Sequence, residues 1–390
     1  ASRGRGSVGM SAGIVIVGAG LAGQRCCEAL RARGWEGPIR LVGDEEHGPY
    51  DRPPLSKGLL AGTTEAAEVA LRAPGWHAEH GVELVLGAAA TGLDPGRREV
   101  LLAEGRRLRY ERLVVATGGA PRVLPILRGR TSVHVLRTLD DALALRAVLR
   151  PGVRLAVVGA GLVGLEVAAT AQALGAAVTV VEAAPAPLAA VLGERIGGWL
   201  AALQRAAGVE VLTGVTLDAV DGGARVGALR LGDGRRIACD AVLMAVGMAP
   251  ASGWLDGCGL PAGAIAADSE GRTRLPEVYA AGDVRGAGHW EAAARQGAAV
   301  AATILGVPAP AAPPAAFWSD QHGVRLQFAG SAAGHDRVEV DGDPLAGDAC
   351  ALFHRRGRLV GGLLVGRPRD LPALRERLQE TTLEHEWSAA

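Results

Sequence analysis

The sequence predicts an α/β protein that contains two parallel-sheet domains and a small C-terminal α+β domain. Two segments carry this prediction, because each has a short apolar run, a glycine-rich turn, a helix and a second apolar run. The first runs are Ile14–Val17 and Leu155–Val158, and the second runs are Ile39–Val42 and Val178–Val181. This β–turn–α–β pattern, present twice, is typical of a Rossmann-like fold. A length of 390 residues also exceeds the size of one ordinary domain.

Three later apolar runs read as further strands that end at glycine. Leu113–Ala116 leads to Thr117-Gly118-Gly119, Ala241–Val246 leads to Gly247, and Val278–Ala281 leads to Gly282-Asp283. A Pro/Ala stretch from Val307 to Ala316 has the composition of a linker.

The segment beyond this linker predicts the small α+β domain. Short alternating runs lie at Arg325–Ala329, Arg337–Val340 and Leu359–Val365, and a helix is expected at Pro372–Gln379.

These boundaries define the expected domains. Residues 1–11 are expected to be a disordered leader, and 12–119 with 247–310 form the first nucleotide-binding domain. Residues 120–246 form the second, and 311–390 form the C-terminal domain.

Composition excludes several classes of protein. The formal net charge is zero, so bulk positive charge does not predict a nucleic-acid binder. Hydrophobic residues make up 49% of the chain, which allows a large core. Five cysteines form no C-x-x-C pair, so we expect a cytoplasmic protein with no disulfide framework, metal site or iron–sulfur cluster. The apolar stretch Leu155–Val181 contains Glu166 and regularly spaced glycines, which favours a nucleotide motif over a membrane span.

The two glycine-rich turns predict dinucleotide binding. They read Gly18-Ala19-Gly20-Leu21-Ala22-Gly23 and Gly159-Ala160-Gly161-Leu162-Val163-Gly164. In such a motif the first glycine permits the tight turn, the second lets the backbone approach a pyrophosphate, and the third lets the helix pack on the strand. The amino end of the helix then faces the anion. One copy alone is weak support, but both copies follow a strand and open a helix.

In each copy, an acidic residue after the second strand is expected to bind the ribose of the nucleotide. Glu182 follows Val178–Val181, where a carboxylate accepts hydrogen bonds from an adenosine ribose and repels a 2′-phosphate. The second copy is therefore expected to prefer NADH to NADPH. In the first copy either Asp44 or Glu45 could bind the ribose of the cofactor, and Asp44 is preferred.

The run from Tyr50 to Lys57 (Tyr-Asp-Arg-Pro-Pro-Leu-Ser-Lys) closely resembles the FAD-dependent ferredoxin reductases that serve cytochrome P450s and aromatic-ring dioxygenases. The resemblance extends from about residue 12 to about residue 380. Other matching stretches are 116–122, 136–139, 164–168, 279–283, His289-Trp290, Gln296-Gly297 and 317–321. The family implies a fold of the glutathione reductase type, with FAD and NAD domains followed by a C-terminal domain.

The resemblance also implies roles for individual residues. Lys57 would lie by the flavin ring, paired with Glu166, and these two are the expected catalytic residues. The residues expected to bind FAD are Gly18, Gly20, Leu21, Ala22, Gly23, Asp44, Arg52, Lys57, Ala90, Ala116, Thr117, Gly118, Arg137, Gly282, Asp283, Trp290 and Trp318. Those expected to bind NAD are Gly159, Gly161, Leu162, Val163, Gly164, Glu182 and Gly247.

The chemistry of Lys57 agrees with this role. It is the only lysine among 41 Lys and Arg residues. Reduction places negative charge on a flavin, and a fixed ammonium stabilises that charge. A planar guanidinium is a poor substitute for a compact ammonium at the edge of a ring. A lysine that merely caps a surface loop is the alternative.

The expected activity is that of an NADH:ferredoxin oxidoreductase. NADH would give a hydride to FAD, and electrons would pass singly to a separate 2Fe–2S ferredoxin that feeds a P450 or Rieske-type oxygenase. Two alternatives stay open. One is an NADH oxidase or biosynthetic flavoenzyme with oxygen or a small molecule as acceptor, and the other is a largely non-catalytic, nucleotide-sensing flavoprotein. The Cys26-Cys27 pair is expected to be packed inside the first domain and not redox-active.

Overall fold

The chain forms two compact units in the computed structural model, which describes residues 12–286, 288–309 and 313–388. The first unit contains the described residues of Ala1–Asp51, Ala70–Gly119 and Ala249–Ala311. The second contains those of Arg52–Val69, Ala120–Met248 and Ala312–Ala390. The leader expected at residues 1–11 lies outside the described residues.

The segment Arg52–Val69 belongs to the second unit, whereas the boundaries expected from the sequence place it in the first. Specific bonds explain this difference. Thr170 Oγ1 donates to the backbone oxygen of Ser56 at 2.8 Å, and Lys57 pairs with Glu166. The C-terminal segment also belongs to the second unit.

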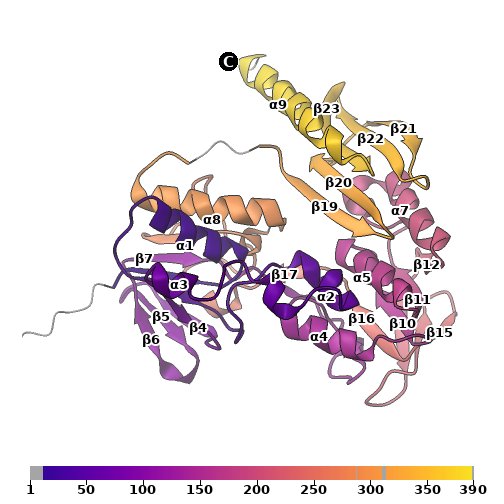
Figure 1. Cartoon of the computed structure of the whole chain (residues 1–390), viewed down its shortest axis with the longest axis horizontal. Coiled ribbons are helices and arrows are strands. Elements are labelled where there is room, and N and C mark those ends of the chain that lie inside the picture. Colours follow the sequence, from indigo (N-terminus) through magenta and orange to yellow (C-terminus); the bar gives the residue numbers. More distant parts are fainter. Residues whose placement is uncertain (1–11, 287, 310–312, 389–390) are drawn as a thin grey trace, which may run out of the picture. The chain divides into compact units, whose positions relative to one another are not determined.

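A five-stranded parallel sheet forms the centre of the first unit, with the order β18-β7-β1-β2-β3 (Figure 1). Its strands are β18 (Val278–Ala280), β7 (Arg112–Val115), β1 (Ile14–Val17), β2 (Ile39–Val42) and β3 (Val82–Val85). Helices α1 (Leu21–Ala32) and α8 (Trp290–Leu305) lie side by side on the sheet. Short pieces are α3 (Trp76–Glu79), η3 (Ala103–Gly105), η5 (Gly253–Leu255) and η6 (Asp283–Arg285).

The alternation of side chains along β1 builds two cores in this unit. Ile14 and Ile16 pack toward α1 and α8. Val15 and Val17 pack with a three-stranded antiparallel sheet on the other face. The strands of that sheet are β4 (Ala90–Asp94), β5 (Glu99–Leu102) and β6 (Arg107–Arg109).

The second unit also has a five-stranded parallel sheet, with the order β12-β11-β10-β16-β9. Its strands are β12 (Glu210–Thr213), β11 (Ala177–Glu182), β10 (Arg154–Val158), β16 (Ala241–Met244) and β9 (Val133–His134). The helices are α2 (Gly58–Ala61), α4 (Leu139–Val148), α5 (Leu162–Ala173), α6 (Ala189–Leu192) and α7 (Glu194–Ala206). An antiparallel sheet contains β13 (Leu217–Asp221), β14 (Ala228–Leu231) and β15 (Arg236–Ala238). Short 3-10 turns are η1 (Pro53–Ser56), η2 (Ala66–Val69) and η4 (Pro125–Leu127).

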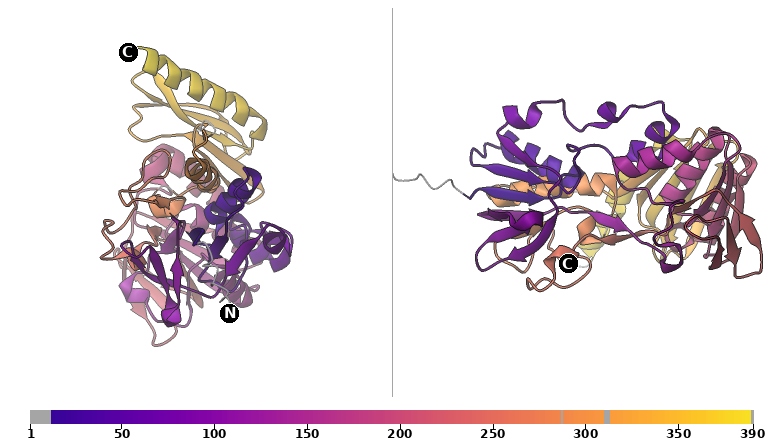
Figure 2. Two further views of the ribbon diagram at one scale, coloured as in Figure 1. Left: turned by 90° about the vertical axis from the view of Figure 1, so that its left-hand side faces the viewer. Right: turned by 90° about the horizontal axis from the view of Figure 1, so that it is seen from below.

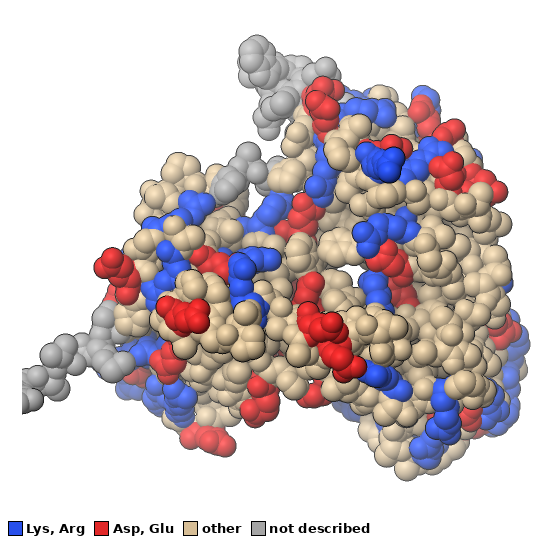
Figure 3. Space-filling view, viewed as in Figure 1, with Lys and Arg blue, Asp and Glu red and all other residues tan. Residues whose placement is uncertain are grey.

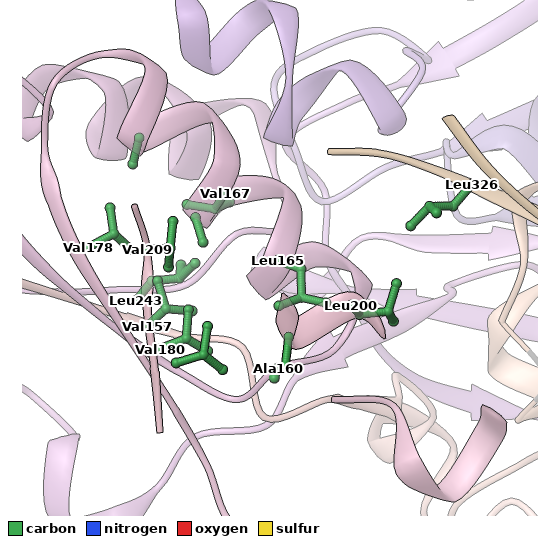
Figure 4. Close-up of a cluster of buried hydrophobic side chains, with 14 of the residues drawn as sticks. Val157, Ala160, Leu165, Val167, Val178, Val180, Leu200, Val209, Leu243 and Leu326 are labelled. Carbon is green, nitrogen blue, oxygen red and sulfur yellow. The ribbon is translucent and has the colours of Figure 1, made fainter. Parts of the chain in front are cut away.

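The main core of the second unit holds α5 against the sheet. Leu165 of α5 and Leu200 of α7 share this core with Val157 and Val180 of the central strands (Figure 4). Leu326, from the C-terminal segment, belongs to the same buried cluster. This packing anchors both the helix and the C-terminal strands in one unit. Strands β8 (Gly119–Pro121) and β17 (Met248–Pro250) contain two of the points where the chain passes between units.

The C-terminal segment folds as an antiparallel sheet with one helix, as Figure 2 shows, which confirms the α+β prediction. The sheet order is β19-β20-β23-β22-β21. The strands are β19 (Ala316–Gln321), β20 (Val324–Gly330), β23 (Arg358–Val365), β22 (Asp348–Arg355) and β21 (Arg337–Asp343). A short turn, η7 (Pro368–Asp370), leads into α9 (Leu371–Ser388), which packs on β20 and β23 and is longer than the predicted helix.

The surface charge and the hydropathy of the helices agree with what the composition indicates. Figure 3 shows acidic and basic side chains interspersed on the visible surfaces of the units. Within residues 12–286, 288–309 and 313–388, no helix combines the length and the apolar character needed to cross a membrane.

Candidate active site and nucleotide-binding turns

The glycines of the first turn meet the steric demands of a dinucleotide motif. Gly18 has a φ of +120°, and a Cβ atom there would lie 2.1 Å from the carbonyl oxygen of Ala116. A Cβ on Gly23 would lie 2.1 Å from the carbonyl oxygen of Gly18. Around Gly20, by contrast, no atom lies within 4 Å of the Cβ position. The turn is therefore closed against side chains at its two ends and open in the middle, where a phosphate group would fit.

The second turn repeats this arrangement. Gly159 has a φ of +103°, and a Cβ there would lie 2.4 Å from the carbonyl oxygen of Ala245. A Cβ on Gly164 would lie 2.3 Å from the carbonyl oxygen of Gly159, while the nearest atom to a Cβ on Gly161 is 4.0 Å away. Gly20 and Gly161 are the N-cap residues of α1 and α5, and each helix has 12 residues. Each unit thus holds one turn that fits a pyrophosphate.

Acidic side chains lie beside both turns. Glu182 ends β11, and its carboxylate accepts hydrogen bonds from the backbone N–H groups of Ala160 at 2.6 Å and Ala184 at 2.8 Å. These bonds hold the carboxylate at the second turn. Near the first turn Asp44 is exposed, whereas Glu45 accepts a hydrogen bond from the Tyr50 hydroxyl at 2.5 Å.

The ion pair between Lys57 and Glu166 is present in the second unit. Lys57 Nζ lies 2.7 Å from Glu166 Oε2, and the side chains are 21% and 7% exposed. Lys57 lies between η1 and α2, and Glu166 lies on α5. Glu166 and Thr170 are one helical turn apart, so they face the 53–57 segment together. The pair is thus built by packing a loop against one face of α5.

Two hydroxyl groups complete the environment of the Glu166 carboxylate. Ser56 Oγ donates to Oε2 at 2.5 Å, and Ser319 Oγ donates to Oε1 at 2.7 Å. Ser319 comes from β19 in the C-terminal segment. A buried carboxylate costs several kcal/mol unless its charge and lone pairs are satisfied, and here an ammonium and two hydroxyls satisfy them.

Residues of the resemblance motifs also make defined bonds within the first unit. Trp290 Nε1 donates to Asp51 Oδ1 at 2.5 Å, and Thr117 Oγ1 donates to the backbone oxygen of Ala251 at 2.7 Å. Burial lowers the pKa of His289, the residue before Trp290, although the nearby Asp283 carboxylate raises it. His289 therefore stays neutral near pH 7 at the start of α8.

The structure assigns the predicted site residues to the two units. The first unit contains Gly18, Gly20, Leu21, Ala22, Gly23, Asp44, Ala90, Ala116, Thr117, Gly118, Gly282, Asp283 and Trp290. The second contains Arg52, Lys57, Arg137, Gly159, Gly161, Leu162, Val163, Gly164, Glu166, Glu182, Gly247 and Trp318. The Arg52 guanidinium donates to the backbone oxygen of Arg137. The contact of each residue with a cofactor stays a prediction.

Sequence reasoning assigned no role to the polar partners of Glu166. Ser56 and Ser319 lie inside the motifs that carried the resemblance, but their hydroxyls were not singled out. They are 110 and 153 residues from Glu166, so no local spacing points to them. Their position in a motif, next to Lys57 and Trp318, was the available signal.

The cysteines are thiols without disulfide partners. Cys26 and Cys27 are fully buried in the core between α1 and the sheet, which confirms that they are packed. Burial raises the pKa of Cys26 to about 12 and also raises that of Cys27. Such thiols are inert as nucleophiles.

Comparison with known proteins agrees with this geometry. Residues 12–297 match the model of the family "Pyridine nucleotide-disulphide oxidoreductase", and residues 316–386 match "Reductase C-terminal". The ferredoxin–NAD(+) reductase component of the biphenyl dioxygenase system of Paraburkholderia xenovorans is 38% identical over 361 residues, covering 90% of this chain and 87% of that protein. The ferredoxin reductase component of chlorobenzene dioxygenase from a Cupriavidus species is 37% identical over 385 residues, covering 95% and 93%.

Solved structures give the same result. The chain matches putidaredoxin reductase in its covalent complex with putidaredoxin with a TM-score of 0.91 and 33% identity, covering 95% of this chain and 93% of that one. The fold is therefore of the expected type, with two nucleotide-binding domains and a C-terminal domain. The chain belongs to the pyridine nucleotide–disulphide oxidoreductase family and, within it, to the ferredoxin reductases of the putidaredoxin reductase type.

Proposed function

We propose that this protein is an NADH:ferredoxin oxidoreductase with FAD as its cofactor. Its physiological acceptor would be a separate 2Fe–2S ferredoxin that supplies a P450 or a Rieske-type oxygenase. The observation that carries the proposal is the ion pair between the half-buried Lys57 and the buried Glu166, in a chain with two complete dinucleotide turns. Relatives that share about 37% of the sequence over nearly the whole chain act in dioxygenase systems, as their names state.

The two turns divide the nucleotides between them. The first turn, with its open position at Gly20 and the amino end of α1, would hold the pyrophosphate of FAD. The second, open at Gly161 before α5, would hold that of NADH. Bound FAD would accept a hydride from NADH and release the electrons one at a time to the ferredoxin.

Lys57 would stabilise the negative charge that reduction creates. Its Nζ is fixed by Glu166 Oε2 at 2.7 Å and also lies 3.3 Å from the backbone oxygen of Pro53. Glu166, itself held by Ser56 and Ser319, keeps the ammonium from moving. A charge that is already oriented pays no reorganisation energy when the electrons arrive.

The expected preference for NADH depends on Glu182. Because its carboxylate is held at the glycine turn by Ala160 and Ala184, it would meet the adenosine ribose of a nucleotide bound there. A 2′-phosphate would bring a second negative charge to the same place and would be repelled. Comparing kcat/KM for NADH and NADPH tests this directly.

One experiment tests the function as a whole. The purified yellow protein is reduced with NADH without oxygen, and candidate acceptors are then added singly while flavin absorbance is followed. Rapid reoxidation by a 2Fe–2S ferredoxin, and cytochrome c reduction that depends on it, are expected. Fast turnover with oxygen alone would instead identify an NADH oxidase, and failure of NADH to bleach the flavin would refute the proposal.

We further propose a cytoplasmic location. The five cysteines have no disulfide partners, as suits a reducing compartment. Fractionation of cells with an antibody to the protein checks this, and recovery in the periplasmic fraction would contradict it.

A further inference from the structure

A line of buried polar side chains leads away from Glu166 through the second unit. Ser319 Oγ lies 2.7 Å from Glu166 Oε1, and Gln321 Nε2 lies 3.0 Å from Ser319 Oγ. Gln204 Nε2 of α7 lies 3.0 Å from Gln321 Oε1. The exposed fractions of Gln204, Ser319 and Gln321 are 0%, 0% and 1%, so these groups must satisfy one another without solvent.

A backbone carbonyl sets the direction of the whole line. Gln204 Nε2 lies 3.1 Å from the carbonyl oxygen of Leu165, which can only accept. The amide nitrogen of Gln204 must therefore face Leu165, and its second hydrogen goes to Gln321 Oε1. The Gln321 nitrogen then donates to Ser319, whose own hydrogen is left to donate to Glu166. The carbonyl group of Leu165 thus orients the amides of Gln204 and Gln321. With both amides oriented in this way, Ser319 donates its hydrogen to Glu166.

The far end of the line is a strained histidine. His322 Nε2 lies 3.0 Å from Gln204 Oε1. His322 has a φ of +50° and is followed by Gly323 with a φ of +77°, in the two-residue turn between β19 and β20. Positive φ disfavours residues other than glycine, and the bond to Gln204 offsets that strain. Burial lowers the pKa of His322, so the ring is neutral. Because Gln204 Oε1 can only accept, the proton of the ring lies on Nε2 and is donated to that oxygen.

We propose that Ser319 is a positioning residue for Glu166, oriented by Gln321 and Gln204. Its hydroxyl donates to Oε1 and holds that oxygen, so that Oε2 faces Lys57 and Ser56. Through Ser319, strand β19 thereby supports the ion pair, although it bonds to Glu166 and not to Lys57. This inference rests on the proposed role of Lys57 and Glu166 in flavin reduction.

The first test replaces the hydroxyl alone. Ser319→Ala is expected to lower the plateau rate of flavin reduction at saturating NADH about 10-fold, with FAD content and Kd for NADH little changed. Ser319→Thr, which keeps the hydroxyl, should recover most of the rate.

A second variant distinguishes the loss of hydrogen bonding from a packing defect at Ser319. Gln321→Leu keeps the volume but removes the donor to Ser319, and a fall of roughly 3-fold is expected. Ser331→Ala is the control, because this exposed serine of the same segment accepts only a bond from the Ala333 N–H. If Ser319→Ala and Gln321→Leu keep the plateau rate of Ser331→Ala, the inference is wrong while the proposed function stands. If the unmodified protein is not reduced by NADH, the proposed function itself fails.

Discussion

The Cβ atom that Gly164 lacks would lie 2.3 Å from the carbonyl oxygen of Gly159. The first turn of α5 therefore closes on the start of its own glycine turn, and only a residue without a side chain fits. This contact holds the amino end of α5 where a pyrophosphate would bind.

Gly164→Ala should consequently weaken NADH binding by more than about tenfold, or ~1.4 kcal/mol, because the helix must move away from the turn. Gly198→Ala on α7 is the matched control, since no atom lies within 4 Å of its Cβ position and alanine favours a helix. Measuring the rate of flavin reduction at increasing NADH concentration, in a rapid-reaction instrument, gives the Kd for NADH of each variant. Equal Kd values for the two variants would contradict the steric account.

Replacing Lys57 should slow flavin reduction more than it alters binding. We expect Lys57→Ala and Glu166→Ala each to lower the plateau rate by roughly tenfold or more, since the first removes the ammonium and the second removes the carboxylate that fixes it. Lys57→Arg should not restore the rate, because a guanidinium has a different shape. Arg97→Ala, which removes an exposed pair with Asp94, serves as the control. Stopped-flow absorbance measures the rate, and unchanged rates in both alanine variants would remove these residues from the mechanism.

Glu182 should determine the choice of nucleotide. Glu182→Gln keeps a hydrogen-bond acceptor but removes the negative charge, so kcat/KM with NADPH relative to NADH should rise by roughly tenfold. Glu210→Gln on the neighbouring strand, an exposed residue bonded to Thr179, should leave the ratio unchanged. Steady-state kinetics with both nucleotides decides the matter, and equal ratios in the two variants would count against a ribose-binding role.

The buried cysteines should take no part in electron transfer. With a pKa of about 12, Cys26 carries almost no thiolate at pH 8, and its reactivity should increase only as the pH approaches that value or the protein unfolds. Iodoacetamide at pH 8 should therefore leave Cys26 and Cys27 unmodified in the native protein but alkylate both in urea, as mass spectrometry can show. A Cys26→Ala variant should keep ferredoxin-dependent turnover within about twofold. Rapid alkylation of the native pair would show that this core opens.

The features that sequence predicted well are those encoded by neighbouring residues. Gly18, Gly20 and Gly23 lie within six positions of one another, and their conformations follow from the turn and helix that they join. The same holds for Gly159 and its partners. Lys57 and Glu166 are far apart in sequence, and their pairing came from a family resemblance and not from spacing.

The features that sequence missed depend on tertiary packing. Nothing between Arg52 and Val69 indicates that this segment leaves the sheet that precedes it and packs on α5. Gln204 sits among the apolar residues of α7, and its partner Gln321 is 117 residues away. In the C-terminal segment, β19 and β22 were not predicted as strands. The strands that lie beside such a segment in the sheet, and not its local sequence pattern, determine whether it forms a strand.

A protein with a single ε-amino group has an unusual chemical profile. Any reagent or enzyme that acylates, carbamylates or conjugates lysine side chains has one target in this sequence, and that target is engaged with Glu166. Amine-directed labelling, read at Lys57 by peptide mapping, thus becomes a site-selective probe, whose extent reports how often the ion pair opens. For the same reason, acetylation of a lysine in this protein would always modify Lys57 and would remove the positive charge beside the Glu166 carboxylate.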